Sequence, residues 1–379
     1  MVLLSVRRAT TMGVLSAMLV GATANATAQT ALASSACPTI ALHMPPPPPG
    51  AMPPGGPPRV PMARTIAPSD TSNSIVIHPD PSWQIECGKT TLTSSKDVVF
   101  SHPRLGAGSA LPLEMDIMAP AAPGRRPAVV YIPGGGFVFA SKENALDLRT
   151  YVAEKGFVVA SIQYRTAMNG ATYRDGLADV KSAIRFLRAH ADQYGVDARH
   201  VAVWGESAGG YLAAMAGVTG NTKAFDVGEN LDQSSAVQAV VDKFGSSDIS
   251  RIAADFDFQD QAEFARPGPI GAYLRTSYSA AGAKTDPAAN PISYVSRSDP
   301  PFLLMHGSQD RLISPSQTLI LHDALLAAGG HSTRYVLAGA NHGDLSFMGD
   351  LESGKPWSAR QTMDVIVDFL KANLDSTRP

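Results

Sequence analysis

Residues 201–216, VAVWGESAGGYLAAMA, carry the pattern that decides the fold. The apolar run 201–204 is typical of a strand buried on both faces of a parallel sheet, and the apolar residues from 211 onward are typical of a helix packed against that sheet. Between them, residues 205–209 spell GESAG, the G-x-S-x-G pattern of a serine on a sharp strand-to-helix turn. Side chains two positions either side of that serine would collide with neighbouring backbone, which explains the glycines at 205 and 209.

Ser207, at the centre of this turn, is the predicted nucleophile. A serine hydroxyl is a weak nucleophile and needs an adjacent base, which in turn needs a group to orient it. The turn places the serine at the N-terminus of the following helix, where free N–H groups favour developing negative charge. The rest of the chain should therefore supply a histidine and a carboxylate.

His342 is the histidine whose position best fits a general base, among the nine in the chain. It follows the predicted last strand, 332–337, in the loop GANHGD (339–344). Loops at the carboxyl ends of parallel strands collect the site of an open α/β sheet. His331 precedes that strand and is expected at the opposite edge. His306 ends an earlier strand, and its ring is expected to support the turn that follows.

Asp310 is the predicted partner of this histidine. It lies in HGSQDRLI (306–313), again a turn after a strand. A carboxylate there can accept the second N–H of the imidazole, hold its tautomer and stabilise the imidazolium. Two alternatives are that Asp310 only shapes a turn, and that Asp248, at the end of the preceding strand, takes this role.

The backbone is expected to supply donors for a developing oxyanion. Ala208 follows the nucleophile, and Gly134-Gly135-Gly136 follow the predicted strand 128–133. Consecutive glycines let N–H groups face a ligand, so Gly135 and Gly136 are predicted to form an oxyanion hole with Ala208. The alternative for the glycine run is a flexible turn.

The remaining pattern alternates strands and helices, which indicates a mostly parallel sheet with helices on both faces. Residues 248–290 do not continue this alternation of strands and helices. They contain aromatic side chains among polar residues and prolines, a pattern that predicts a partly helical lid. Ser314 is the expected N-cap of a helix over 315–328. The predicted strands are 97–100, 111–118, 128–133, 157–164, 201–204, 239–244, 301–307 and 332–337, and the other predicted helices are 144–156, 175–190 and 357–374.

Residues 1–28 are predicted to be a signal peptide. Arg7 and Arg8 precede an apolar run, 12–20, that is too short to span a bilayer, and small residues follow it. We expect an exported protein, periplasmic or secreted, with no membrane span after signal removal. An uncleaved anchor is the alternative.

Residues 29–94 are predicted to be a proline-rich extension or linker, and 95–379 the catalytic domain. Proline and glycine dominate 45–61, which is typical of a solvated spacer, with a site for a proline-recognising partner as the alternative. The two cysteines of the chain, Cys37 and Cys87, lie in this extension. In an exported protein they could pair, and two unpaired thiols are the other possibility.

The composition suits one large α/β domain with an appendage: 379 residues, 44% hydrophobic and 17% charged. With a formal net charge of −2 and no basic run, neither nucleic acid nor an acidic membrane surface is expected as a partner. The sequence contains no phosphate-binding loop, dinucleotide fingerprint or metal-spaced Cys/His cluster. We therefore expect neither a metal nor an organic cofactor.

The chain resembles α/β-hydrolases of the hormone-sensitive-lipase-like and acetyl-esterase/lipase group, and is closest in spelling to the branch with bacterial acetylxylan and feruloyl esterases. The order Ser207, Asp310, His342 is that of the α/β-hydrolase triad. The resemblance runs from about residue 97 to the end and implies the fold and a serine mechanism more strongly than any substrate. The matching stretches are YIPGGGF (131–137), GESAGG (205–210), NPISYV (290–295), DPPFLLMHG (299–307) and GANHG (339–343).

One position departs from that group. Its members usually carry a histidine before the three glycines, and hydrogen bonds from that histidine brace the loop. Here the residue is Pro133, which has no N–H to donate and which stiffens the backbone. Because the glycine N–H groups remain, we expect the oxyanion hole to survive with an altered shape.

These features predict a serine carboxylesterase that hydrolyses acetyl, feruloyl or other short-chain or aryl esters, small or polysaccharide-linked, through an acyl-enzyme. One alternative is a serine peptidase of the prolyl-oligopeptidase type, against which the short N-terminal region and the glycine run both count. Another is a non-catalytic binding module on the same fold, against which the presence of Ser207, Asp310 and His342 counts. Fold alone does not separate these functions.

Overall fold

The computed structural model describes residues 35–39, 61–105, 108, 110–264, 267–279 and 282–374. The predicted signal peptide, and all but the last residue of the proline-rich stretch 45–61, lie outside the described residues. No helix within the described ranges is both long and apolar enough to cross a membrane.

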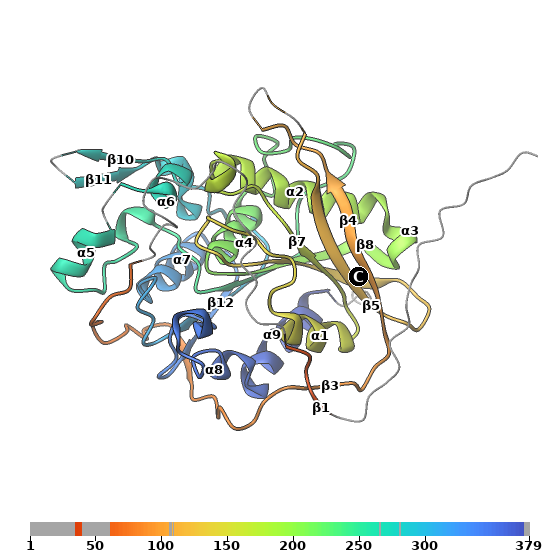
Figure 1. The fold of residues 1–379 in the computed structure, drawn as a ribbon, viewed down its shortest axis with the longest axis horizontal. Coiled ribbons are helices and arrows are strands. Elements are labelled where there is room, and N and C mark those ends of the chain that lie inside the picture. Colours follow the sequence, from red (N-terminus) through yellow and green to blue (C-terminus); the bar gives the residue numbers. More distant parts are fainter. Residues whose placement is uncertain are drawn as a thin grey trace, which may run out of the picture.

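A mostly parallel sheet of nine strands forms the centre of the described part of the chain, in the order β2-β13-β12-β9-β8-β6-β7-β5-β4 (Figure 1). Strand β5 runs antiparallel to both of its neighbours, β4 and β7, and the other pairs are parallel. The strands are β2 (Ile75–Ile77), β4 (Leu92–Ser101), β5 (Leu113–Pro120), β6 (Arg126–Ile132), β7 (Val158–Ile162), β8 (Val196–Glu206), β9 (Ala239–Lys243), β12 (Phe302–Gly307) and β13 (Ser332–Leu337).

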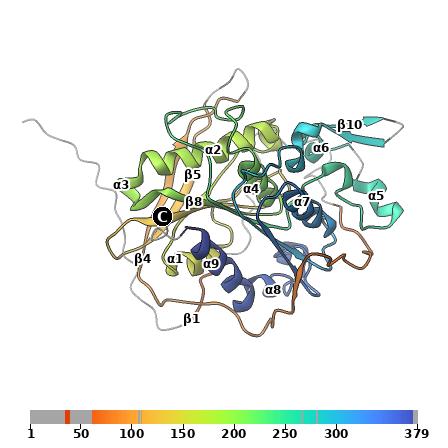
Figure 2. The same cartoon turned by 180° about the vertical axis from the view of Figure 1, so that it is seen from behind.

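Helices cover both faces of this sheet, which confirms the predicted fold class. Helices α2 (Tyr173–Ala189), α4 (Ala208–Val218) and α7 (Ser316–Ala327) pack with one buried cluster, and α1 (Leu146–Glu154) and α9 (Arg360–Leu374) pack with the other (Figures 1 and 2). The central strands are apolar on both faces, as the run 201–204 predicted, because each face meets helices rather than water. Short helices α3 (Ala191–Tyr194) and α8 (Lys355–Ser358) flank the larger ones.

Residues 248–290, the predicted lid and called the lid below, are partly helical as predicted, and they also contain a β-hairpin that the sequence did not indicate. The pieces of the lid are the 3₁₀ turns η2 (Ile249–Arg251) and η3 (Pro287–Ala289), helices α5 (Phe258–Phe264) and α6 (Pro269–Tyr273), and strands β10 (Thr276–Ser279) and β11 (Gly282–Thr285).

The predicted N-cap of α7 is wrong. Ser316 N–H donates to the carboxylate of Asp255 in the lid at 2.8 Å, while Ser314 Oγ accepts from Asp255 N–H at 2.9 Å.

The described part of the N-terminal extension folds onto the domain. Cys37 and Cys87 form a disulfide, which settles the two possibilities left open by the sequence. The bond links the residue after strand β1 (Ser35–Ala36) to strand β3 (Glu86–Cys87), and these two short strands pair antiparallel. Strand β2 adds to the main sheet, parallel to β13. The structure therefore carries the sheet further toward the N-terminus than the predicted domain start at residue 95.

Residues 61–70, which we call the strap, join the lid to the turn that holds Asp310. Ala63 N–H donates to Arg311 O at 2.8 Å. Arg64 donates to Asp260 on helix α5 from its backbone N–H at 2.7 Å and from Nε at 3.1 Å. Because the partners lie about 200 to 250 residues away, no local pattern in the sequence indicates these contacts.

Removing the buried carboxylate of Asp260 should loosen helix α5 from the strap. Asp260→Ala deletes the acceptors of both Arg64 bonds, so local opening should become easier by about 1 kcal/mol. We expect cleavage within the lid, in limited proteolysis by chymotrypsin, to become about three- to tenfold faster. Asp192→Ala is the control, because it removes an ion-paired aspartate that is 85% exposed and lies outside the strap and the lid. Equal lid cleavage rates in the two variants would contradict this role of the strap.

Candidate active site

The turn at Ser207 is strained and has room only for glycine on either side. Ser207 has φ 54° and ψ −118°, between β8 and the first residue of α4. A Cβ on Gly205 would lie 2.0 Å from Gly209 O, and a Cβ on Gly209 would lie 2.0 Å from Ile132 O. Ser207 N–H donates to Lys243 O at 2.9 Å, which fixes the turn to the end of β9. This is the geometry that the GESAG pattern predicts.

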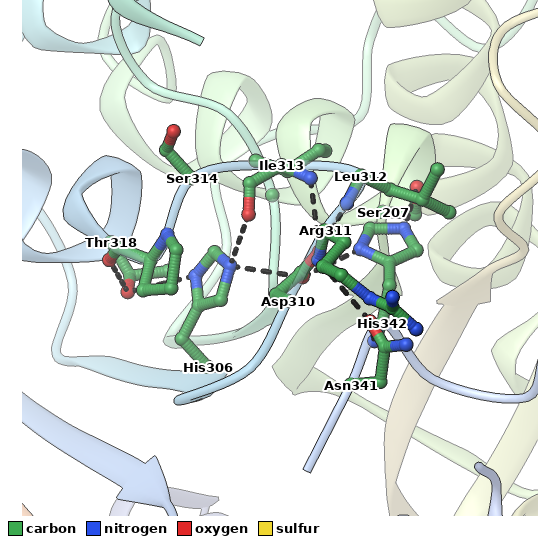
Figure 3. Close-up of polar contacts among 12 residues, drawn as sticks. Ser207, His306, Asp310, Arg311, Leu312, Ile313, Ser314, Thr318, Asn341 and His342 are labelled. Atoms are coloured by element: carbon green, nitrogen blue, oxygen red, sulfur yellow. Dashed lines mark hydrogen bonds and ion pairs between the residues drawn. The ribbon is translucent and has the colours of Figure 1, made fainter. Parts of the chain in front are cut away.

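The structure brings the three residues of the predicted triad together (Figure 3). His342 Nε2 lies 2.8 Å from Ser207 Oγ, and His342 Nδ1 lies 2.7 Å from Asp310 Oδ2. The tautomer that fits is Nδ1–H donating to the carboxylate, which leaves the Nε2 lone pair for the serine hydroxyl. The rival carboxylate, Asp248, instead pairs with Arg251 at 2.6 Å. A serine held in this way can lose its proton to the imidazole as it attacks a carbonyl.

Asp310 is fully buried and surrounded by donors. Its Oδ1 accepts N–H bonds from Leu312 at 2.8 Å and Ile313 at 2.9 Å. Burial by itself would raise the pKa of Asp310, but charge interaction with His342 and hydrogen bonds from His306 and His342 hold it well below its ordinary value. The carboxylate is therefore ionised at any pH at which the imidazole can act as a base.

His306 orients Asp310 from the side opposite His342 (Figure 3). Its Nε2 lies 3.1 Å from Asp310 Oδ2 and 3.1 Å from Ile313 O. Both neighbours are acceptors, so Nε2 carries the proton. Burial lowers the pKa of His306, which keeps the ring neutral. The sequence predicted that this ring supports the turn, and the structure adds its contact with the carboxylate.

The glycine run lies directly over the nucleophile. A Cβ on Gly134 would lie 3.3 Å from Ser207 Cβ, and Gly135 and Gly136 have φ of 146° and 59°. Within the described residues, no acceptor takes the N–H of Gly135, Gly136 or Ala208. These groups are therefore available to a ligand, and their place in an oxyanion hole stays a prediction.

A tyrosine braces the glycine run where the related group uses a histidine. Tyr164 OH donates to the carbonyl of Pro133 at 3.0 Å. Tyr164 is 3% exposed and Pro133 directly precedes the glycines. The loop is therefore anchored through the proline's acceptor rather than through a side-chain donor at that position.

The site opens into a cavity of about 2450 Å³. Its lining includes Ser207, His342 and the glycine run, and extends to the lid and to the disulfide-linked segment at Cys37. Three exposed apolar side chains also line it: Phe258, Met348 and Leu351. Small-molecule pockets commonly measure about 300–1,000 Å³, so this cavity has room for a substrate considerably larger than an acetyl ester. Among the described residues, no cluster of three or more histidine, cysteine or acidic side chains could hold a metal ion.

A family model described as BD-FAE matches residues 115–325, more than half of the chain. The chain belongs to the BD-FAE family. Among curated proteins, esterase LipC of Mycobacterium tuberculosis is 33% identical over 219 residues, covering 57% of this chain and 53% of LipC. Isoprenylcysteine alpha-carbonyl methylesterase ICME of Arabidopsis thaliana is 26% identical over 251 residues, covering 66% of this chain and 57% of ICME. The chain thus spans little more than half the length of these relatives.

Solved structures of esterases share the fold. A truncated carbohydrate esterase from gut microbiota superposes with a TM-score of 0.60 at 24% identity, covering 79% of this chain and all of that one. Esterase 2 of Thermogutta terrifontis superposes with a TM-score of 0.58 at 24% identity, covering 74% and 94%. These likenesses establish an α/β-hydrolase fold for this member of the BD-FAE family.

Asp242, beside the turn, gives a test of the electrostatics around α4. It is fully buried, and burial raises its pKa to about 7 although Gly245 N–H donates to Oδ1 at 2.8 Å. The raised pKa favours the protonated acid, so this contribution to stability is complete below about pH 4 and is lost as the pH rises toward 7.

Asp242→Asn should remove this pH dependence. Between pH 4 and pH 8, the free energy of unfolding of the variant relative to wild type should rise by about 4 kcal/mol. Urea titrations of both proteins across this range measure it, with the exposed Asp192→Asn as a control that should show no such trend. Parallel curves for Asp242→Asn and wild type would rule out a neutral Asp242.

Proposed function

We propose that this member of the BD-FAE family is a serine carboxylesterase that works through an acyl-enzyme. The observation that carries the proposal is the hydrogen-bonded chain from Ser207 Oγ through His342 to Asp310. It opens on a large cavity, beside backbone N–H groups that have no acceptor in the described part of the chain. Family membership and the esterase relatives support the same reaction class.

In the acylation half, Ser207 Oγ attacks the ester carbonyl carbon while His342 Nε2 takes its proton. Asp310 stabilises the imidazolium that forms, because its carboxylate is ionised and fixed by two backbone N–H bonds. The carbonyl oxygen gains negative charge, and the N–H groups of Ala208, Gly135 and Gly136 hold it. Each donor aimed at such a charge contributes about 3 kcal/mol to lowering the barrier. The imidazolium then gives its proton to the alkoxide that leaves.

In the deacylation half, water takes the place of the alcohol. His342 removes a proton from this water, the hydroxide adds to the acyl carbonyl, and the same N–H groups hold the oxyanion again. Collapse returns the proton to Ser207 and frees the carboxylic acid. All groups that these steps require are protein groups, and the steps use no metal or organic cofactor.

The proposed substrates are acetyl, feruloyl or other short-chain or aryl esters, either small or linked to polysaccharide. The size of the cavity and the exposed apolar residues Phe258, Met348 and Leu351 in its lining support a substrate with a bulky or aromatic part. One structural neighbour is described as a carbohydrate esterase and one relative as a methylesterase, so the proposal names this class of esters and no single alcohol.

We further propose that the protein is exported, with residues 1–28 as its signal peptide. The basic and apolar pattern of the N-terminus supports this, and so does the Cys37–Cys87 disulfide, since such bonds persist in oxidising compartments. N-terminal sequencing of the protein recovered from the periplasm or medium tests it. A mature chain that starts near residue 28 is expected, and retention of Met1 in the cytoplasm would overturn it.

Hydrolysis of p-nitrophenyl acetate, butyrate and octanoate by the purified protein tests the proposed reaction. Wild type should turn over at least one of these esters, and Ser207→Ala should lose about 10⁴-fold or more in kcat, because the triad acts as a unit. Ser161→Ala is the control: its hydroxyl is buried in strand β7, away from the triad, and has no partner among the described residues. Equal activity of wild type and Ser207→Ala would refute the proposal.

A further inference from the structure

Lys243 is a buried cation among three aromatic rings, beside the turn that holds the nucleophile. It ends strand β9, is 1% exposed, and its Nζ lies 2.5 Å from Glu206 Oε1. The ammonium lies 5.1 Å from the ring centre of Trp357, 5.6 Å from Phe244 and 5.9 Å from Trp204. A lysine is rarely so buried unless it is paired, and three rings together with a carboxylate compensate its lost hydration.

The backbone of Lys243 also holds the strained turn. Its carbonyl accepts Ser207 N–H at 2.9 Å, while its side chain pairs with Glu206, the residue before the nucleophile. Ser207 has φ 54°, and Phe244, the residue after Lys243, has φ 47°. Non-glycine residues at positive φ cost free energy and persist only where surrounding contacts hold them. One of these two residues, Ser207, donates the hydrogen bond to Lys243 O. The other, Phe244, directly follows the residue that accepts it.

The same group of rings reaches the histidine of the triad. The Phe244 ring packs against His342 and against Trp357, each with ring centres 4.6 Å apart. Trp357 Nε1 donates to Asn341 O at 3.0 Å, one residue before His342. A Cβ on Gly343, one residue after it, would lie 2.8 Å from Phe244 Cζ. The base is thus enclosed by rings that also enclose Lys243.

We propose that Lys243 is a positioning residue of the site, which fixes the nucleophile turn through Glu206 and its own carbonyl and fixes the His342 loop through Phe244 and Trp357. The proposal rests on the esterase function proposed above. Lys243 does not touch the substrate or the reacting atoms in this scheme. It couples the placement of the nucleophile to that of the base, which come from segments 135 residues apart.

The Lys243–Glu206 pair also lies close enough to act on His342 by its charge. The ammonium and the imidazole contact the same Phe244 ring, at 5.6 Å and 4.6 Å from its centre, so they are at most about 10 Å apart. Asp310 and, beyond it, His306 face the imidazole from the other side. At an effective dielectric constant of about 20, one uncompensated charge at this distance shifts the pH at which the imidazole is half protonated by about one pH unit.

Other charged groups face the pair from the strand and helix packed against it. Asp147 of helix α1 interacts by charge with both Glu206 and Lys243. The hydroxyl of Tyr131 on β6 faces Glu206, and Arg149 of α1 faces Tyr131. These groups stay in place when either member of the pair is replaced, so a single substitution changes the local charge by one.

The test compares Glu206→Gln, Lys243→Met and the double variant, through the pH dependence of kcat/KM for p-nitrophenyl butyrate. Glu206→Gln leaves the ammonium uncompensated, which disfavours the imidazolium. The acid limb of the pH profile, where kcat/KM falls as His342 gains a proton, should therefore move about one pH unit lower. Lys243→Met leaves the carboxylate, and the limb should move about as far upward. The double variant should return near the wild-type midpoint. Because the turn loses its side-chain anchor, kcat should fall about tenfold or more in Lys243→Met with KM little changed.

Lys181→Met is the matched control. Lys181 is fully buried in helix α2, on the other face of the sheet, and pairs with Asp226 at 3.5 Å. Its loss should lower stability while leaving the acid limb where it is. Melting curves recorded by circular dichroism show which variants are folded at the assay temperature.

The rate at which a fluorophosphonate labels Ser207, followed over the same pH range, separates the two proposals, because labelling needs an activated serine but no ester substrate. Opposite shifts of the labelling profile in the two single variants, cancelled in the double variant, support the positioning role even where no ester is hydrolysed, a result that would overturn the esterase proposal alone. Coincident profiles for wild type and all three folded variants would overturn the role of Lys243.

Discussion

The backbone strain at Ser207 is the constraint on which the rest of the site depends. A serine at φ 54° presents its hydroxyl above the edge of the sheet, but this conformation persists only if neighbouring backbone can approach closely. Gly205 and Gly209 provide that approach, and the carbonyl of Lys243 takes the serine N–H. The central strands β6, β8 and β9 are thereby fixed in the arrangement that places the glycine run over the nucleophile.

A second constraint is the burial of Asp310. A carboxylate without access to water must be satisfied by the protein, and two backbone N–H groups and two imidazoles satisfy this one. The same contacts fix the orientation of the carboxylate, whose Oδ2 accepts the Nδ1–H of His342. His306, at the end of β12, therefore contributes to the placement of the base although it never approaches Ser207. The strap reaches this turn as well, through Arg311 O.

The sequence predicted those parts of the molecule that local chemistry dictates. The GESAG pattern, the loop positions of Asp310 and His342 and the apolar central strands each depend on residues close in the chain, and the structure has them in the predicted places. Parts that depend on remote partners were not predictable. Strand β2 joins the sheet only because β13, about 260 residues later, offers an edge, and a run of three residues carries no strand signal of its own.

The same limit applies around the site. The lid hairpin β10–β11 lies in a segment without clear alternation of apolar and polar residues, so only its irregular character was predictable. The cap of α7 comes from Asp255 in the lid rather than from the adjacent Ser314. Lys243 reads in the sequence as an ordinary charged residue at the end of a strand. Its importance emerges only when Trp204, Phe244 and Trp357, from three separate segments, surround it.

The central claim is that Ser207 becomes covalently acylated during turnover, and trapping that intermediate tests it most directly. The protein is mixed with p-nitrophenyl butyrate and the reaction is quenched in acid within the first turnovers. The protein is then digested with pepsin, and the peptide masses are measured by mass spectrometry. The account predicts a butyryl group on the peptide that contains Ser207, absent from Ser207→Ala. Turnover without any acylated peptide, or with the acyl group on another residue, would contradict it.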